Sequence, residues 1–126
     1  MSKERIAFGK EGESMAANFL KGLGYKIVCL NYKTKLGEID IIARDKDTVC
    51  FIEVKTRQSD RFGLPQEAVS WRKQLQVSKT AVIYLKENNL LDKKARFDVV
   101  SALNSDKGLE FSLIRNAFEL SESYAY

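Results

Sequence analysis

The sequence contains no histidine. This absence excludes Ser-His-Asp and Cys-His catalytic machinery and any metal site built on imidazole ligands. Acid–base or metal chemistry in this chain therefore depends on carboxylates, lysines, hydroxyls and bound water.

Cysteines and long apolar runs are also scarce. Cys29 and Cys50 do not belong to a Cys-x-x-Cys pair, which argues against a disulfide scaffold and a structural zinc site. The longest apolar run is five residues, Ala81 to Leu85, so no segment predicts a membrane-spanning helix. The first residues lack the apolar stretch of a signal peptide, and we expect a cytoplasmic protein.

The composition is that of a soluble globular protein. The 126 residues are 44% hydrophobic and 30% charged, which is too apolar for a disordered tail. Neither an internal repeat nor a Pro/Gly-rich linker divides the chain. We therefore expect residues 1–126 to form a single domain.

The net charge of +4 arises within one segment. Residues 55–79 hold six basic and two acidic residues, and the remainder of the chain is neutral. Such a basic stripe is typical of a protein that binds a polyanion. On charge alone, a solvated helix face explains it equally well. The basic residues of the stripe are Lys55, Arg57, Arg61, Arg72, Lys73 and Lys79.

Hydrophobic periodicity predicts seven elements in the order α-β-β-β-α-β-β, an α/β fold with a mixed central sheet flanked by helices. Met15 to Leu20 define the expected buried arc of the first helix. Pro65 suits the first turn of the second helix, whose inward side we expect to include Ala68, Trp71, Leu75, Val82 and Leu85. The expected helices cover about 3–23 and 65–86, the strands 25–32, 37–44, 48–57, 96–103 and 109–115, and a helical turn 116–120.

The hairpin over residues 37–57 carries the most chemistry. In its first strand we expect Ile39, Ile41 and Ala43 to share a face, with Glu38, Asp40 and Ile42 on the other. In its second strand Cys50, Ile52 and Val54 share a face, with Phe51, Glu53 and Lys55 on the other. Burying both apolar faces fixes the parity of the pairing. A loop of two or four residues then sets Asp40 opposite Glu53 and Glu38 opposite Lys55.

Two adjacent carboxylates in partly buried strands need a shared proton or a cation. Asp40 and Glu53 are oxygen ligands of the type that Mg²⁺ or Mn²⁺ prefers, and Lys55 projects to the same side. An ordinary exposed sheet face with alternating charges is the other interpretation. Ile42 and Phe51 favour a covered face over an exposed one.

The wider pattern resembles the YraN-like family of bacterial proteins, which is similar to the PD-(D/E)XK endonucleases, and to Holliday-junction resolvases in fold. Ile39 stands where the proline of the superfamily name is found. The matching motifs, which cover nearly the whole chain, are Gly12-Glu13, Gly24-Tyr25, Asn31, Gly37-Glu38-Ile39-Asp40, Glu53-Val54-Lys55-Thr56-Arg57, Phe62-Gly63, Glu67-Ala68-Val69, Lys73 and Arg96-Phe97-Asp98-Val99-Val100.

The resemblance implies a restriction-endonuclease-like core with Mg²⁺ or Mn²⁺ as cofactor. Its implied metal ligands are Asp40, Glu53 and Glu13, with Lys55 as the catalytic lysine. Helix geometry independently puts Glu13 just past the Leu20 edge of the buried arc, within reach of a site at the sheet edge. A surface glutamate favoured by the helix dipole is the other interpretation of Glu13.

Supporting roles fall to residues around these four. We expect Glu38 to assist Lys55 rather than bind metal, and Gln74 to lie beside the site with Lys73, although a plain surface pair explains Lys73 and Gln74 equally well. Trp71 is assigned to the core and Asp98 to a structural ion pair. The residues expected to contact DNA phosphates are Arg57, Arg61, Arg72, Lys73 and Lys79.

Three functions remain in competition. The first is a metal-dependent endonuclease acting on branched or otherwise structured DNA. The second is a nucleic-acid-binding module of the same fold with little or no cleavage, and the third is an interaction protein that self-associates through its sheet. The complete Asp-Glu-Lys set favours the first. DNA is thus the expected partner, and a homodimer is left open by analogy with resolvases.

Overall fold

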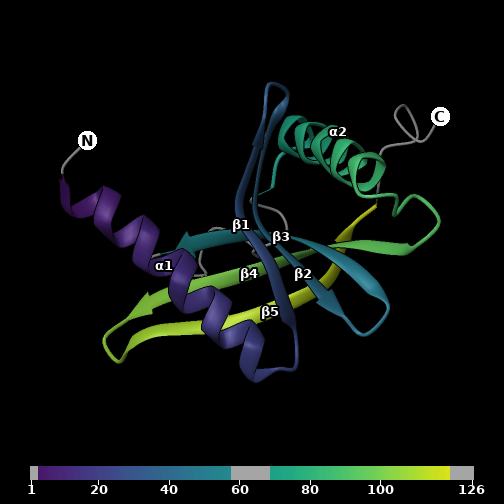
Figure 1. The fold of residues 1–126 in the computed structure, drawn as a ribbon. Coiled ribbons are helices and arrows are strands. Elements are labelled where there is room, and N and C mark those ends of the chain that lie inside the picture. Colours follow the sequence, from purple (N-terminus) through teal and green to yellow (C-terminus); the bar gives the residue numbers. More distant parts are fainter. Residues whose placement is uncertain (1–2, 58–68, 120–126) are drawn as a thin grey trace.

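The structure, a computed structural model, describes residues 3–57 and 69–119, and the side chains of the first helix from residue 12 onward. Within these residues, two helices and five strands follow one another in the predicted α-β-β-β-α-β-β order (Figure 1). The elements are α1 (Lys3–Gly22), β1 (Lys26–Thr34), β2 (Gly37–Asp45), β3 (Thr48–Arg57), α2 (Trp71–Glu87), β4 (Lys94–Ser105) and β5 (Gly108–Phe118).

The strands form one sheet in the order β1-β2-β3-β4-β5. Among the described strands only β3 and β4 pair in parallel, since α2 lies in the crossover that joins them, and the other neighbouring strands are antiparallel. This mixed sheet confirms the predicted α/β fold and is consistent with a restriction-endonuclease-like core. Within the described residues, neither helix is long and apolar enough to cross a membrane.

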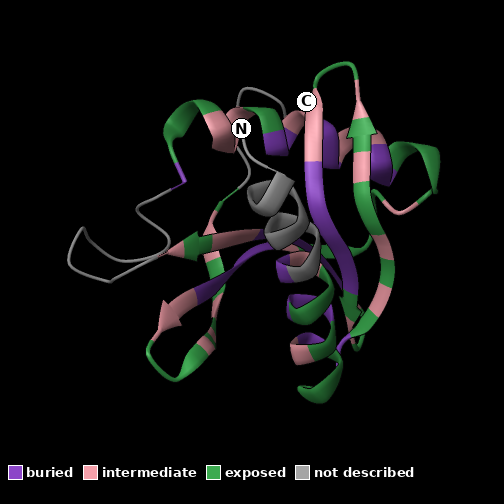
Figure 2. Ribbon diagram, turned by 90° about the vertical axis from the view of Figure 1, so that its left-hand side faces the viewer, coloured by how far each residue is buried: buried purple, intermediate pink, exposed green. Residues whose placement is uncertain are grey.

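Each helix covers one face of the sheet, so both faces of the central strands are buried (Figure 2). Ala16, Ala17 and Leu20 of α1 pack on Ile41 and Ile52. On the opposite face the cluster under α2 contains these residues of the helix and the sheet: Val77, Ala81, Tyr84, Leu85, Ile39, Ile42, Val49, Phe51 and Phe97. The expectation that Ile42 and Phe51 lie on a covered face is confirmed.

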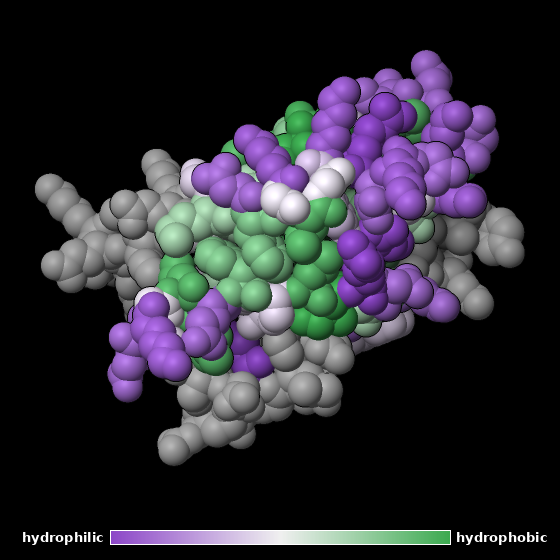
Figure 3. Space-filling model, turned by 90° about the horizontal axis from the view of Figure 1, so that it is seen from below, coloured by the Kyte–Doolittle hydropathy of each residue, from purple (hydrophilic) through white to green (hydrophobic). Residues whose placement is uncertain are grey.

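The edge of the α1 layer leaves apolar side chains partly open. Phe19 of α1 stacks on Phe111 of β5 with ring centroids 5.5 Å apart, and both side chains are only partly buried. Met15 is 43% exposed, so its expected place in the buried arc is wrong. In the view from below, apolar side chains gather in one area edged by hydrophilic ones (Figure 3).

The second helix starts later than predicted. Ser70 has an extended backbone, with φ −63° and ψ 160°, and its Oγ accepts a hydrogen bond from the Lys73 N–H at 3.1 Å. A serine N-cap satisfies one of the free N–H groups at a helix start, so the helix begins at Trp71 and not at Pro65. Residues 58–68, including Pro65 and Ala68, lie outside the described part.

The buried side of α2 is rotated about the helix axis relative to the predicted inward side. Trp71 is 66% exposed, and its assignment to the core is therefore wrong. Leu75 and Val82 are only half-buried, whereas Leu85 is buried as expected. The other described buried residues of the helix are Val77, Ser78, Thr80, Ala81 and Tyr84.

The last two strands are longer than predicted and form one hairpin. Their pairing continues to Ser105 and Gly108, across a two-residue turn at 106–107. β5 runs through Asn116 to Phe118, so the expected helical turn from residue 116 is wrong. Asn116 has φ 53° at an irregularity of the β4–β5 register, and this left-handed residue bends the strand without ending it.

Candidate functional site

Asp40 lies at a point in β2 where the regular alternation of side chains between the two faces of the sheet is broken. Ile41 packs in the α1 cluster, whereas Ile39 packs in the α2 cluster. The prediction that Ile39 shares a face with Ile41 and Ala43 is therefore wrong. In the neighbouring strand Asn31 has φ 55°, and the pairing passes from Leu30↔Ile41 to Tyr32↔Ile39 without an Asn31 pair. The β1–β2 register is continuous across Asn31, so this left-handed residue stands opposite Asp40, at the change of face.

The β2–β3 register brings Asp40 to Glu53. Asp45 pairs with Thr48 across a two-residue loop, and the last paired residues are Ile41 and Ile52. One further step along both strands places Asp40 beside Glu53. Asp40 Oδ2 accepts a hydrogen bond from the Val54 N–H at 2.9 Å, which holds the carboxylate against β3. The predicted parity of the hairpin is confirmed.

Both carboxylates are shielded from water. Asp40 is 8% and Glu53 6% exposed. Burial, followed by the Asp40 carboxylate, raises the pKa of Glu53 to about 7, and the Lys73 and Lys55 charges oppose this rise. Burial also raises the pKa of Asp40, with the Val54 N–H opposing it and the Glu13 charge adding to it. Holding both groups ionised near neutral pH is therefore costly without further positive charge.

A lysine from α2 supplies part of that charge. Lys73 Nζ lies 3.5 Å from Glu53 Oε1, and the lysine side chain is 27% exposed. Glu53 Oε2, in contrast, is buried and has no hydrogen-bond partner among the described residues. A buried carboxylate oxygen without a partner is costly, so Oε2 is the Glu53 oxygen that would gain most from binding a cation, whereas Oε1 already has Lys73.

The middle of α1 approaches the same end of β3. A Cβ added to the buried Gly12 would lie 3.8 Å from Thr56 Oγ1, so the helix passes close to the strand. The half-buried Glu13 is near enough to raise the pKa of Asp40. Within residues 3–57 and 69–119, however, no three carboxylates or thiols come close enough together to form a metal-binding group. Glu13 is thus a neighbour of the pair, not an assembled third ligand.

Glu38 and Gln74 have structural partners. Glu38 Oε2 lies 3.9 Å from Lys33 Nζ on the paired strand β1, in place of the expected Lys55. Gln74 Nε2 donates to the Val69 carbonyl at 3.0 Å and so ties α2 to the residue before its N-cap. Lys55 is half-buried, and its charge lowers the pKa of Glu53. The structure thus brings Lys55 and Lys73 to the carboxylates.

The remaining basic residues are less closely connected to this site. Arg72 is exposed, and Arg57 and Lys79 are half-buried. At about 100° per residue, Arg72 and Lys79 lie on one side of α2 and Lys73 on another. Arg61 lies outside the described residues, and a single continuous phosphate-binding stripe stays a prediction.

A buried polar network lies around the start of β4, where Arg96 Nη2 donates to Asp45 at 2.8 Å and to the Tyr25 hydroxyl at 2.6 Å. Its Nε donates to the fully buried Asp98 at 3.1 Å, so the expected structural ion pair of Asp98 is confirmed. The part of Tyr25 in this network was not predicted, because a single tyrosine before a strand gives no sign of a hydrogen-bond partner 73 residues away.

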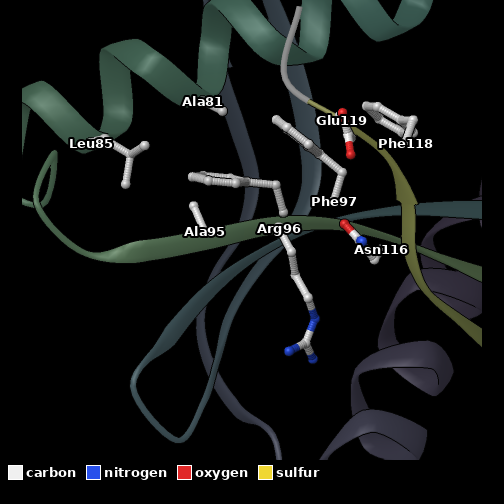
Figure 4. Close-up of a pocket in the computed structure, with 9 residues that line it drawn as sticks. Ala81, Leu85, Ala95, Arg96, Phe97, Asn116, Phe118 and Glu119 are labelled. Atoms are coloured by element: carbon white, nitrogen blue, oxygen red, sulfur yellow. The ribbon is translucent and has the colours of Figure 1, made fainter. Parts of the chain in front are cut away.

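The cavity near this end of β4 is separate from the carboxylates. It has a volume of about 300 Å³ and is lined by aromatic residues that include Phe51, Phe97 and Phe118. Arg96 borders it, but the guanidinium points to the other side of β4 from Phe97 (Figure 4). Neither Asp40 nor Glu53 lines the cavity, so it does not bear on the candidate site.

Comparisons with other proteins find relatives over almost the whole chain. The model of the family described as "Uncharacterised protein family UPF0102" matches residues 12–102. A UPF0102 protein of Syntrophus aciditrophicus is 49% identical over 117 residues, which cover 93% of this chain and 92% of the relative. One of Desulfosudis oleivorans is 45% identical over 119 residues, or 94% and 95% of the two chains. One of Acetivibrio thermocellus is 48% identical over 118 residues, or 89% and 91%.

Proposed function

The chain belongs to the uncharacterised protein family UPF0102, as its YraN-like motifs predicted, and we propose that it is a metal-dependent endonuclease that hydrolyses phosphodiester bonds in structured or branched DNA. The observation that carries this proposal is the buried pair Asp40 and Glu53, in which Glu53 Oε2 has no hydrogen-bond partner in the described part of the chain. A protein that only bound nucleic acid would gain nothing from two abutting buried carboxylates, because they repel each other and the phosphates.

The donor set fits Mg²⁺ or Mn²⁺. Both cations prefer carboxylate oxygens, and Mg²⁺ is commonly held by one or two protein carboxylates, with water and substrate phosphates completing its shell. Asp40 and Glu53 meet that requirement without a third protein ligand, and Glu13 adds negative charge nearby. When bound, such a cation would act as a Lewis acid on a phosphate oxygen and make water a better nucleophile.

The two lysines have separate parts in this proposal. Lys55 follows Glu53 by two residues on β3, and its ammonium would bind a non-bridging phosphate oxygen and stabilise the charge that develops there. Lys73 reaches the same carboxylate from α2. It would keep the pair close together before substrate arrives, and it brings positive charge to the entrance for a polyanion.

Cleavage of supercoiled plasmid and of a four-way junction tests the proposal. We expect activity with Mg²⁺ or Mn²⁺, loss of activity with a chelator, and at least a hundredfold loss in Asp40→Asn and Glu53→Gln. Asp40→Asn keeps an oxygen acceptor for the Val54 N–H, so it removes the charge with little disturbance of the strand. Glu110→Gln, at an exposed position on β5, is the matched control. Equal cleavage by Asp40→Asn and wild type would refute the assignment.

A nucleic-acid-binding module without cleavage is the second candidate. It is favoured by the Lys73–Glu53 ion pair, which already places a cation on one carboxylate, and by the lack of a three-ligand cluster among the described residues. Titration calorimetry separates the two. An endonuclease should bind Mn²⁺ in a manner abolished by Glu53→Gln, whereas a binding module should bind DNA without metal and show no such Mn²⁺ binding.

A further inference from the structure

The exposed indole of Trp71 has no packing role in the described core. Trp71 is the single tryptophan of the chain and the first residue of α2, and it is 66% exposed. One exposed apolar residue is ordinary on a protein surface. Its position is less ordinary, because two residues further along the same turn Lys73 contacts the buried Glu53.

Helix geometry relates the two side chains. Residues two positions apart on a helix are rotated by about 200° around its axis, which leaves them about 160° apart, so Trp71 and Lys73 lie on opposite sides of the first turn. Trp71 shares its side with the half-buried Leu75 and Val82. A helix with its side chains is about 10 Å wide, so a strand that crosses the N-terminal end of α2 passes both the indole and the ammonium.

The charges of this turn favour an anionic partner. Arg72 and Lys73 stand in the first turn of α2, and that turn has no acidic residue. A helix N-terminus carries partial positive charge, so acidic residues are the favourable ones there and two basic residues are not. The arrangement becomes favourable when a polyanion such as a DNA backbone crosses the turn. Lys73 of this turn contacts Glu53, whose Oε2 has no partner among the described residues, so a DNA strand that crosses the turn also passes the candidate site.

We propose that Trp71 stacks on an unpaired base of a DNA strand whose phosphate lies at Asp40 and Glu53. The inference rests on the proposed nuclease function and narrows its substrate to DNA with unpaired nucleotides beside the cleaved bond. Bases within a duplex are already stacked on each other, and an aromatic ring gains a base face only where the stack is open. Stacking is tolerant of sequence, because every base has an aromatic face.

Tryptophan fluorescence tests the stacking directly, because the emission comes from Trp71 alone. The Asp40→Asn protein, in the presence of chelator, is titrated with a short oligothymidylate, with a fully abasic oligonucleotide of the same length, and with a duplex. The abasic chain has the same phosphate charge and lacks only the bases. We expect strong quenching by oligothymidylate, weak quenching by the abasic chain, and weaker quenching by the duplex than by oligothymidylate.

Affinities from the anisotropy of labelled oligonucleotides complete the test. Trp71→Ala should weaken oligothymidylate binding by about 5- to 150-fold and leave abasic binding unchanged, and Trp71→Phe should recover part of the loss. Leu91→Ala is the control, since Leu91 is another exposed apolar residue, 59% exposed, beyond the far end of α2. Its binding should equal that of the parent protein.

Each outcome separates this inference from the function on which it rests. Equal quenching and affinity for the abasic and base-containing chains, or no binding of either, would overturn the stacking role of Trp71. Duplex binding with the same quenching would overturn the substrate assignment. Base-dependent quenching without metal-dependent cleavage by the wild type would leave the stacking and remove the nuclease. Cleavage by Trp71→Ala at the wild-type rate on every substrate would leave the nuclease function and overturn the role of Trp71 in binding the substrate.

Discussion

Replacing Glu53 by glutamine should stabilise the metal-free protein at alkaline pH, because the substitution removes a charge that the fold holds at a cost. Burial and the Asp40 carboxylate raise the pKa of Glu53 from 4.5 to about 7. Between these values the folded state retains a proton that the unfolded chain has lost. The free energy of unfolding therefore falls as the pH rises through this window, and the cost is complete above about pH 7.

The size of the effect follows from that pKa difference. One pKa unit corresponds to about 1.4 kcal/mol, so the full cost is on the order of 3 kcal/mol. Glutamine has nearly the same shape, and its Oε1 can still accept a hydrogen bond from Lys73. For a chain of this size, 1 kcal/mol shifts the melting temperature by roughly 3–6 °C. We expect Glu53→Gln to melt roughly 5–15 °C above wild type at about pH 8, and within a few degrees of it at about pH 4.

Thermal unfolding followed by circular dichroism, in chelator and at both pH values, measures this difference. Asp92→Asn, an exposed acid beyond α2, serves as the control and should track the wild type at each pH. Addition of Mg²⁺ should raise the melting temperature of the wild type and not that of Glu53→Gln, because ligand binding to the folded state stabilises it. A difference between wild type and Glu53→Gln that is the same at both pH values, or a Glu53→Gln protein that is less stable at about pH 8, would refute the reasoning.

Three further predictions concern the supports of the site and the sheet. Asp40→Ala should lower the free energy of unfolding by about 1–3 kcal/mol relative to Asp40→Asn in urea titrations, because it leaves the Val54 N–H without its acceptor; equal stability of the two variants would contradict this. Arg96→Met should cost about 3–5 kcal/mol near neutral pH, since it leaves the fully buried Asp98 without its cation, and the cost should shrink in the double variant with Asp98→Asn. A loss that the second substitution does not reduce would argue against the ion pair. Ser70→Ala should lower stability by about 1 kcal/mol and Ser70→Asp should not, as measured by thermal unfolding, because only alanine removes the N-cap acceptor.

The order of elements was predictable because each helix and strand leaves a local pattern in the sequence. Alternating apolar residues define β2 and β3, and the polar residues between them mark their turn. Burial of apolar side chains on both faces then permits only one parity of pairing. That parity places Asp40 beside Glu53, so the central pair of the candidate site follows from sequence alone.

The surroundings of that pair depended on contacts that local patterns do not contain. The ion pair of Lys73 with Glu53 needs α2 to pack across the end of β3, and the sequence shows only that a helix follows. The change of face at Asp40 lies opposite the left-handed Asn31 of β1, and an asparagine tolerates a positive φ without requiring it.

The start of α2 shows how the two kinds of information divide. Pro65 and Ser70 are both residues that favour a helix start, and hydrophobic periodicity together with Pro65 predicted a start at residue 65. Only the hydrogen bond from the Lys73 N–H to Ser70 Oγ decides that the helix begins at Trp71. The indole lies on the surface instead of in the expected core because the side of the helix that packs on the sheet, with Val77, Ala81 and Tyr84, is turned away from Trp71. Sequence thus determined the elements and the carboxylate pair, and long-range packing determined the charges and the surface around them.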